Sequence, residues 1–186
     1  MEDDTLEQIR ADVRYLKDRS DILDCIARHA RGHDRHDADL ISSTYHDDGV
    51  DEHGYAINEG SAYAAWANAQ HAASSTSHLH NVTTHVCELD GDVAHCESYV
   101  MVVLLSPDVT STTIMNGRYV DRLERRDGTW RIAVRRSTVD AVITGDASML
   151  SHPFFKQQGY IKGTRDRDDI SYERPTSLRG AEPTRW

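Results

Sequence analysis

The sequence has few cysteines, and none of them stands close to another. Cys25, Cys87 and Cys96 are the only cysteines among 186 residues. An odd number of cysteines without a C-x-x-C pair disfavours both a disulfide framework and a cysteine-type zinc site. The pattern is typical of a protein kept in a reducing compartment, so we expect a cytoplasmic protein.

Basic residues and long apolar runs are also scarce. Lys and Arg number 21 against 31 Asp and Glu, which gives a formal charge of −10 with His neutral. This balance argues against nucleic acid or an anionic membrane as a partner, because both need clustered cations. The longest apolar run, residues 100–105, is far shorter than the roughly 20 residues of a membrane span, and the acidic start lacks the features of a secretory signal.

The first part of the chain carries helical periodicity. An apolar stripe predicts an amphipathic helix over residues 5–18. Ser20 is a good N-cap for a second helix, which we expect to end at the helix-breaking Gly32. A short helix over 38–45 and an Ala-rich helix over 60–73 follow. The stripe of the first helix consists of Leu6, Ile9, Val13 and Leu16.

The second part of the chain is typical of strands. Residues 80–89, 93–105, 112–125 and 129–142 are rich in β-formers, and Asp-Gly turns stand at two of the junctions. A weaker strand or hairpin signal covers 49–58. Strands joined by short turns form an antiparallel meander, and helices followed by strands indicate the α+β class. We therefore expect a cone-like α+β barrel, with the N-terminal helices packed on a curved antiparallel sheet.

Three segments are expected along the chain. Residues 1–18 form an N-terminal helix extension, residues 19–144 form the α+β domain, and residues 145–186 form a C-terminal tail. The stretch 163–174 is dense in charges of both signs. It suits either a solvated arm or a strap that contacts a neighbouring subunit.

Alternate residues of a strand face opposite sides of a sheet, so each long strand has two sets. In residues 93–105 one set is small and apolar, which suits a closed packing surface. The other set contains Glu97, Tyr99 and Met101, which suits the wall of a pocket. On the next strand, Met115 and Tyr119 share one face.

Three ionisable side chains can meet in such a cavity. Asp34 follows the second helix, His80 begins the first long strand, and Arg135 lies on the last strand. A carboxylate that binds one imidazole nitrogen raises the basicity of the other, so His80 and Asp34 suit removal of a proton from carbon. An arginine can hold a leaving anion. Because the chain has 11 histidines, a merely structural or solvated His80 is the competing interpretation.

A metal site is a rival use of the histidines. His78 and His80 share a strand face, and His33 and His36 are spaced for the end of a helix. No HExxH motif or regular ligand series supports this, so we expect no metal. The absence of GxSxG, GxGxxG and P-loop motifs disfavours a nucleophilic triad and nucleotide cofactors, so no cofactor is expected.

Four segments carry a family resemblance: residues 19–22, 32–34, 78–82 and, most specifically, 117–132. Together they cover about residues 17–140. The chain resembles the SnoaL-like branch of the nuclear transport factor 2 superfamily. Within it, the chain looks most like scytalone dehydratase, bile-acid 7α-dehydratase and hexachlorocyclohexane dehydrochlorinase. Because the fold hosts many functions, this resemblance indicates the fold more strongly than any one activity.

The resemblance implies a cofactor-free lyase that forms trimers and has an Asp–His pair in a cone-shaped pocket. By position, Asp34 and His80 match that pair, and Arg135 matches the pocket arginine of the dehydrochlorinase. His29 stands where the dehydratases have a tyrosine, and Glu97 falls near the second histidine of scytalone dehydratase. The acid for the leaving group is therefore open among Glu97, Tyr99 and Tyr45.

We expect a lyase that removes water, halide or an aldehyde such as formaldehyde from a hydrophobic, aromatic or polycyclic small molecule. An isomerase, and a non-catalytic binding or assembly subunit like a dioxygenase β-subunit, are the alternatives. The chain is expected to form a homo-oligomer, with a trimer favoured over a dimer. Residues expected to shape the substrate site are Glu97, Tyr99, Tyr45, Met101, Met115, Tyr119, Trp66 and His29.

Overall fold

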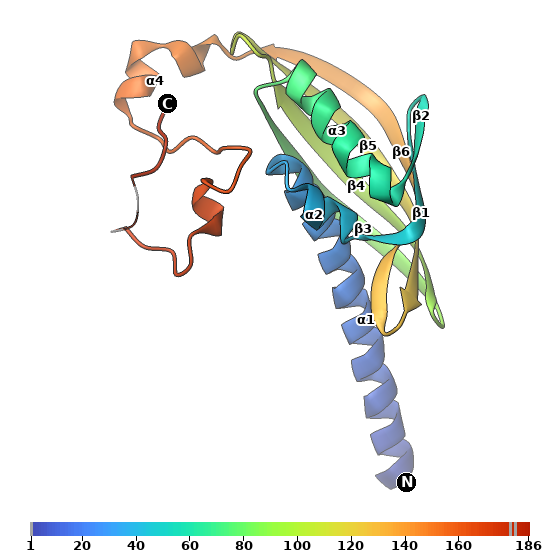
Figure 1. Ribbon diagram of the computed structural model, residues 1–186. Coiled ribbons are helices and arrows are strands. Elements are labelled where there is room, and N and C mark those ends of the chain that lie inside the picture. Colours follow the sequence, from blue (N-terminus) through green and yellow to red (C-terminus); the bar gives the residue numbers. More distant parts are fainter. Residues whose placement is uncertain (1, 179, 181) are drawn as a thin grey trace.

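The computed structural model describes residues 2–178, 180 and 182–186 (Figure 1). Helices come first and a six-stranded sheet follows, with short helical turns near the C-terminus. The elements are α1 (Glu2–Asp34), α2 (Ala38–Ser42), β1 (Tyr45–His53), β2 (Ala56–Glu59), α3 (Gly60–Ser74), β3 (Ser77–Asp90), β4 (Val93–Leu105), β5 (Ser111–Arg126), β6 (Thr129–Asp146), η1 (Ser148–Ser151), α4 (Pro153–Gln157) and η2 (Ile170–Tyr172).

The sheet has the strand order β2-β1-β6-β5-β4-β3. Strands β3 to β6 form the expected antiparallel meander, and the α+β class is confirmed. Two details differ from the expectation. The sheet is open, with β2 and β3 at its edges, so it is not a closed barrel. Strand β1 also pairs with β6 in parallel. A parallel pair needs a long connection between its strands, and here α3 and most of the meander lie between β1 and β6 in the chain.

Helix α1 is one continuous helix of 33 residues, so the predicted cap at Ser20 is wrong, and the helix ends at Asp34, two residues after the predicted end at Gly32. Gly32 serves packing. A Cβ at this position would lie 2.7 Å from Cγ1 of Ile41 and 3.0 Å from its backbone nitrogen. The missing side chain therefore lets α2 approach the last turn of α1 closely.

The N-terminal half of α1 projects beyond the sheet (Figure 1). Its apolar stripe, from Leu6 to Leu16, is between 51% and 64% exposed. Burial begins at Asp18, whose carboxylate accepts hydrogen bonds from Trp130 Nε1 and from Arg125. The helix runs through the expected boundary at residue 18 without interruption. No described helix is long and apolar enough to cross a membrane.

The second half of α1 and helix α3 pack on the same face of the sheet. On β4 the buried set includes Ala94, Cys96 and Ser98, as the small-residue pattern predicts. The core cluster comprises Ile22, Cys25, Ile26, Ile41, Tyr45, Tyr63, Ala64, Ala67, Cys87, Ala94, Cys96, Leu123, Trp130 and Ile132.

The C-terminal tail returns to the helices of its own chain. Arg35 Nε lies 3.1 Å from Asp169 Oδ1, and the Tyr172 hydroxyl donates to Asp37 Oδ2 at 2.9 Å. Arg165 donates to Ser75 Oγ at 2.6 Å. These polar contacts hold residues 165–172 beside α1, α2 and α3. The expected contact of the tail with a neighbouring subunit stays a prediction.

Candidate active site

His80 and Asp34 lie side by side, although 46 residues separate them in the sequence. His80 Nδ1 is 2.7 Å from Asp34 Oδ1, and the backbone N–H of His80 donates to both carboxylate oxygens at 3.0 and 3.1 Å. The side chains are 4% and 14% exposed, respectively. An ionised carboxylate only accepts hydrogen bonds, so Nδ1 carries the proton and Nε2 of a neutral His80 has the free lone pair.

The pair forms where the last turn of α1 meets the start of β3. Strand β3 is an edge strand, so one side of its backbone has no strand partner. The Asp34 carboxylate satisfies the N–H of His80 at that edge while it also holds the ring. One carboxylate therefore fixes both the backbone and the imidazole, which gives the dyad a defined geometry.

Three further imidazoles surround His80. Its ring centroid lies 5.0 Å from that of His33, 5.5 Å from that of His71 and 5.4 Å from that of His78. Burial lowers the pKa of His71 to about 2 and the pKa of His78 to about 3. The rings of His71 and His78 are therefore neutral at pH 7, and Asp34 is the charged group that contacts His80.

His71 is a member of this cluster that the sequence analysis missed. It lies in the last turn of α3, four residues after the buried Ala67. Residues spaced by four share one face of a helix, so extending the buried face of α3 by one turn reaches His71. The helical spacing of the buried face of α3 could therefore have identified His71 from the sequence.

Arg135 is held in the core by two partners. Its Nε and Nη2 donate to the two oxygens of Asp121, both at 2.7 Å, and Nη1 donates to His29 Nδ1 at 2.7 Å. The guanidinium stacks on the ring of Tyr119 at 3.9 Å, and its side chain is fully buried. Asp121 already neutralises the charge of Arg135 inside the core, which argues against the expected role of Arg135 in holding a leaving anion.

His29 and Tyr45 continue this buried network. Arginine only donates, so His29 Nδ1 accepts and Nε2 carries the proton toward the Tyr45 oxygen at 3.2 Å. The Tyr45 hydroxyl donates to Asp51 Oδ2 at 2.6 Å. Burial, more than the charge of Arg135, lowers the pKa of His29, while burial and Asp51 raise the pKa of Tyr45. Both residues were expected at the substrate, and the structure places them in the core.

An apolar row extends from His80 across the sheet. Cross-strand partners share one face, and His80 is opposite Val102, which is opposite Met115, which is opposite Val142. Val102 and Met115 are half-buried, and Val142 is 57% exposed. Met115 thus lies on the face of the sheet where the sequence predicted it.

Glu97, Tyr99 and Met101 lie on the other face of the sheet, so their expected place in the pocket wall is wrong. Val102 is the partner of His80 on β4, and odd-numbered residues of this regular strand point the opposite way. Glu97 contacts Arg118 there at 3.3 Å. The expected separation of a packed face from a catalytic face does not occur, because the helices cover the same face that carries His80.

The remaining predicted residues are two core aromatics. Tyr119 is 3% exposed and lies under the guanidinium of Arg135. Trp66 on α3 is half-buried and packs near His53 and Tyr63, with ring centroids at 5.8 and 6.0 Å. Tyr119 is thus part of the buried interior, and Trp66 packs against the core cluster.

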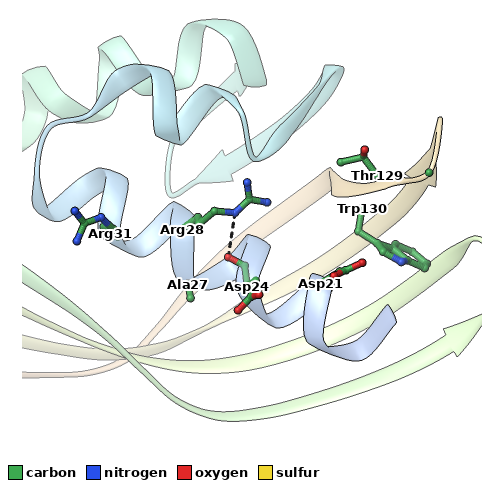
Figure 2. A pocket seen from close by; sticks show the side chains of 8 residues that line it. Asp21, Asp24, Ala27, Arg28, Arg31, Thr129 and Trp130 are labelled. Carbon is green, nitrogen blue, oxygen red and sulfur yellow. Dashed lines mark hydrogen bonds between the residues drawn. The ribbon is translucent and has the colours of Figure 1, made fainter. Parts of the chain in front are cut away.

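A surface depression of about 620 Å³ lies away from the dyad, between α1 and the β5–β6 turn (Figure 2). Charged side chains dominate its rim, and Arg28 Nε donates to the backbone oxygen of Asp24 at 3.4 Å. None of the predicted site residues lines it. The residues around it are Asp21, Asp24, Ala27, Arg28, Arg31, Gly128, Thr129 and Trp130.

Comparison with known proteins gives a family and several similar structures. The profile of the SnoaL-like domain matches residues 14–136. A protein of unknown function from Mycobacterium tuberculosis, Rv3472, whose structure was solved as a single-residue variant, is 30% identical, covering 70% of this chain and 75% of that one with a TM-score of 0.61. No curated protein matches the sequence.

Two similar structures carry the names of lyases. The hexachlorocyclohexane dehydrochlorinase LinA-type3 from Novosphingobium barchaimii is 19% identical over 72% of this chain and 94% of that one, with a TM-score of 0.67. A putative scytalone dehydratase from Novosphingobium aromaticivorans is 16% identical over 77% and 91%, with a TM-score of 0.56. At these identities the similarity shows the shared fold.

Proposed function

The chain belongs to the SnoaL-like domain family, and we propose that it is a cofactor-independent lyase acting on a hydrophobic small molecule. The observation that supports this is the contact of His80 Nδ1 with Asp34 at 2.7 Å, which leaves Nε2 as the basic nitrogen. Elimination needs such a base. In our proposal the residues of this chain supply it without a metal or an organic cofactor.

The proposed step is a β-elimination. Nε2 of His80 takes the proton from a carbon, the C–H electron pair becomes a double bond to the adjacent carbon, and the leaving group departs with the electrons of its own bond. Asp34 keeps the ring in place and stabilises the imidazolium that forms. The leaving group in this step is a halide, or water when the imidazolium of His80 returns its proton to the departing hydroxide. Release of formaldehyde would follow a different step, in which Nε2 takes the proton of a hydroxymethyl group, the O–H electrons form the C=O bond, and the electrons of the broken C–C bond stay on the substrate.

The substrate class follows from the surface beside His80. Val102 and Met115 continue the row of His80 across the sheet with half-buried apolar side chains. Such a surface favours a hydrophobic ring over a charged metabolite. The name of the dehydrochlorinase makes chlorinated cyclohexanes the first substrates to test, followed by hydroxylated polycyclic ketones.

We also propose that the protein is a homo-oligomer, with a trimer as the first expectation. The stripe from Leu6 to Leu16 on the projecting part of α1 is exposed, and so are Val139 and Ile143 on the far half of β6. Apolar surface of this extent is typical of a face covered by another subunit.

The experiment compares wild type with His80→Asn and Asp34→Asn on that panel, and follows chloride release, product mass and deuterium uptake from heavy water. If His80 is the base, His80→Asn lowers turnover at least ~10²-fold. His95→Asn, an exposed histidine on the opposite face, is the matched control and keeps wild-type turnover.

Wild-type turnover by His80→Asn would refute the proposed mechanism. A product with the mass of the substrate would replace the lyase with an isomerase, because proton transfer without a leaving group conserves mass.

A further inference from the structure

Three histidines from three different elements meet next to the dyad. His36 lies in the turn between α1 and α2, His71 lies in the last turn of α3, and His78 lies at the start of β3. One ring nitrogen from each lies within 4.8 Å of the others. The ring of His78 is 4.1 Å from the ring of His71 and 5.3 Å from the ring of His36.

Each of these imidazoles has a buried nitrogen without a hydrogen-bond partner in the described part of the chain. The atoms are His36 Nε2, His71 Nδ1 and His78 Nδ1. Native proteins satisfy nearly all buried polar atoms, so three unsatisfied nitrogens in one cluster require an explanation. A shared ligand that accepts their lone pairs supplies one.

The second nitrogen of His78 is already engaged in the way that a metal ligand requires. Its Nε2 lies 2.7 Å from the backbone oxygen of His33. A carbonyl oxygen only accepts, so Nε2 carries the proton and Nδ1 has the free lone pair. Metal-binding histidines commonly donate their other N–H to a carbonyl in this manner.

His36 adopts a backbone conformation that is uncommon for a residue with a side chain. Its φ angle is 49°, in the left-handed region. Asn68 on α3 donates to the His36 carbonyl at 3.3 Å and helps to hold this turn. Strained residues of this kind concentrate at functional sites. Here the strained backbone of His36 places the ring of His36 beside the ring of His78.

We propose that His36, His71 and His78 bind a divalent first-row transition metal ion, with Zn²⁺ as the first candidate. Three neutral imidazoles suit Zn²⁺, which takes nitrogen ligands at about 2.0–2.1 Å and accepts an open fourth position for water. The rings must contract around the ion from their present spacing. The rival trio of His33, His71 and His80 would occupy Nε2 of His80, which the proposed elimination needs as its base.

The charges near the trio act in opposite directions. Arg165 of the tail donates to the backbone oxygen of His71 at 3.4 Å and to Ser75 Oγ, and its positive charge acts on both His36 and His78. The Asp34 carboxylate lies on the other side, within the same 4.8 Å grouping as His78 and His80. Arg165 therefore weakens cation binding, and its removal is expected to strengthen it.

The sequence alone favoured no metal, because it contains no HExxH motif and no regular ligand series. The inference is independent of the proposed elimination, since the metal site does not use His80. Its test therefore measures binding of the metal alone.

The experiment uses the full chain after treatment with a chelator and dialysis. Binding of ZnCl₂ is measured by calorimetry, and CoCl₂ reports the ligand set through its visible absorption bands. His36→Asn and His71→Asn are each expected to weaken Zn²⁺ binding at least ~10-fold and to change the cobalt spectrum. Arg165→Gln tightens binding, and the exposed control His95→Asn leaves it unchanged.

His85→Asn separates this trio from a further candidate group, formed by His85, Cys87 and Cys96. Loss of binding in His85→Asn with retention in His71→Asn would overturn the proposal. So would an absence of Zn²⁺ binding by the wild-type chain, or unchanged binding in both His36→Asn and His71→Asn. Circular dichroism and the melting temperature establish that each variant is folded. If His71→Asn unfolds, His36→Asn still tests the proposal, because His36 lies in a half-buried turn.

Discussion

Replacement of Asp121 by Ala is expected to destabilise the fold strongly, because it leaves the guanidinium of Arg135 buried without a counter-charge. Both side chains are 0% exposed, and two hydrogen bonds of 2.7 Å join them. Breaking a buried pair from one side costs about 3–5 kcal/mol. A protein of this size loses about 2–4 °C per kcal/mol, so the melting temperature falls by about 6–20 °C.

Urea unfolding followed by circular dichroism measures this change as a shift of the midpoint at constant slope. The surface pair Arg136–Glu52 provides the matched control, because both of its side chains are substantially exposed. Glu52→Ala is expected to leave the midpoint close to that of wild type.

The double variant Asp121→Leu/Arg135→Met tests the cause of the loss. It removes both charges together, so it is expected to recover part of the stability that Asp121→Ala loses. Recovery is incomplete because His29 Nδ1 loses its donor. A free energy of unfolding for Asp121→Ala within about 1 kcal/mol of the wild-type value would refute the assignment of Arg135 as a buried, charge-paired core residue.

Two further predictions follow from the core. Burial holds the pKa of His29 in the folded chain well below 6.5. Below pH 6.5 the unfolded chain therefore takes up a proton at this residue that the folded chain does not. The free energy of unfolding should then fall by up to ~1.4 kcal/mol for each pH unit of acidification. Urea titrations between neutral and mildly acidic pH should show a shallower loss in His29→Gln, and an equal loss in both proteins would contradict this. A Cβ on Gly117 would lie 1.9 Å from the Thr138 carbonyl oxygen, so Gly117→Ala should cost about 1–3 kcal/mol or more. The same substitution at Gly145, where the nearest atom is 4.0 Å away, should stay within about 0.5 kcal/mol in the same assay, and similar costs at both positions would refute the close approach.

The strand part of the fold was predictable because its signals are local. Alternating β-formers and Asp-Gly turns place β3 to β6 within a few residues of their observed bounds. The pairing of β1 with β6 in parallel was not predictable in this way, since nothing within either strand encodes a partner that distant in the chain.

Gly32 shows a different case, in which a local rule places the end of the helix two residues early. Glycine lowers helix propensity, and this predicted an end to the helix. The close approach of Ile41 makes glycine the residue that fits, and tertiary packing outweighs a propensity difference of about 1 kcal/mol. The face of β4 was misassigned for a similar reason: alternation separates two faces, but it does not say which one the helices will cover.

The sequence by itself determined the α+β class, the order of the strands in the meander, and the pairing of Asp34 with His80 through the resemblance of their surroundings to a known family. Only the tertiary structure decided that Arg135 is neutralised by Asp121 and that His71 joins His36 and His78. Local patterns record how each residue relates to its own helix or strand. Charge pairing and ligand geometry depend on distances between elements, and those distances exist only once the helices have packed on the sheet.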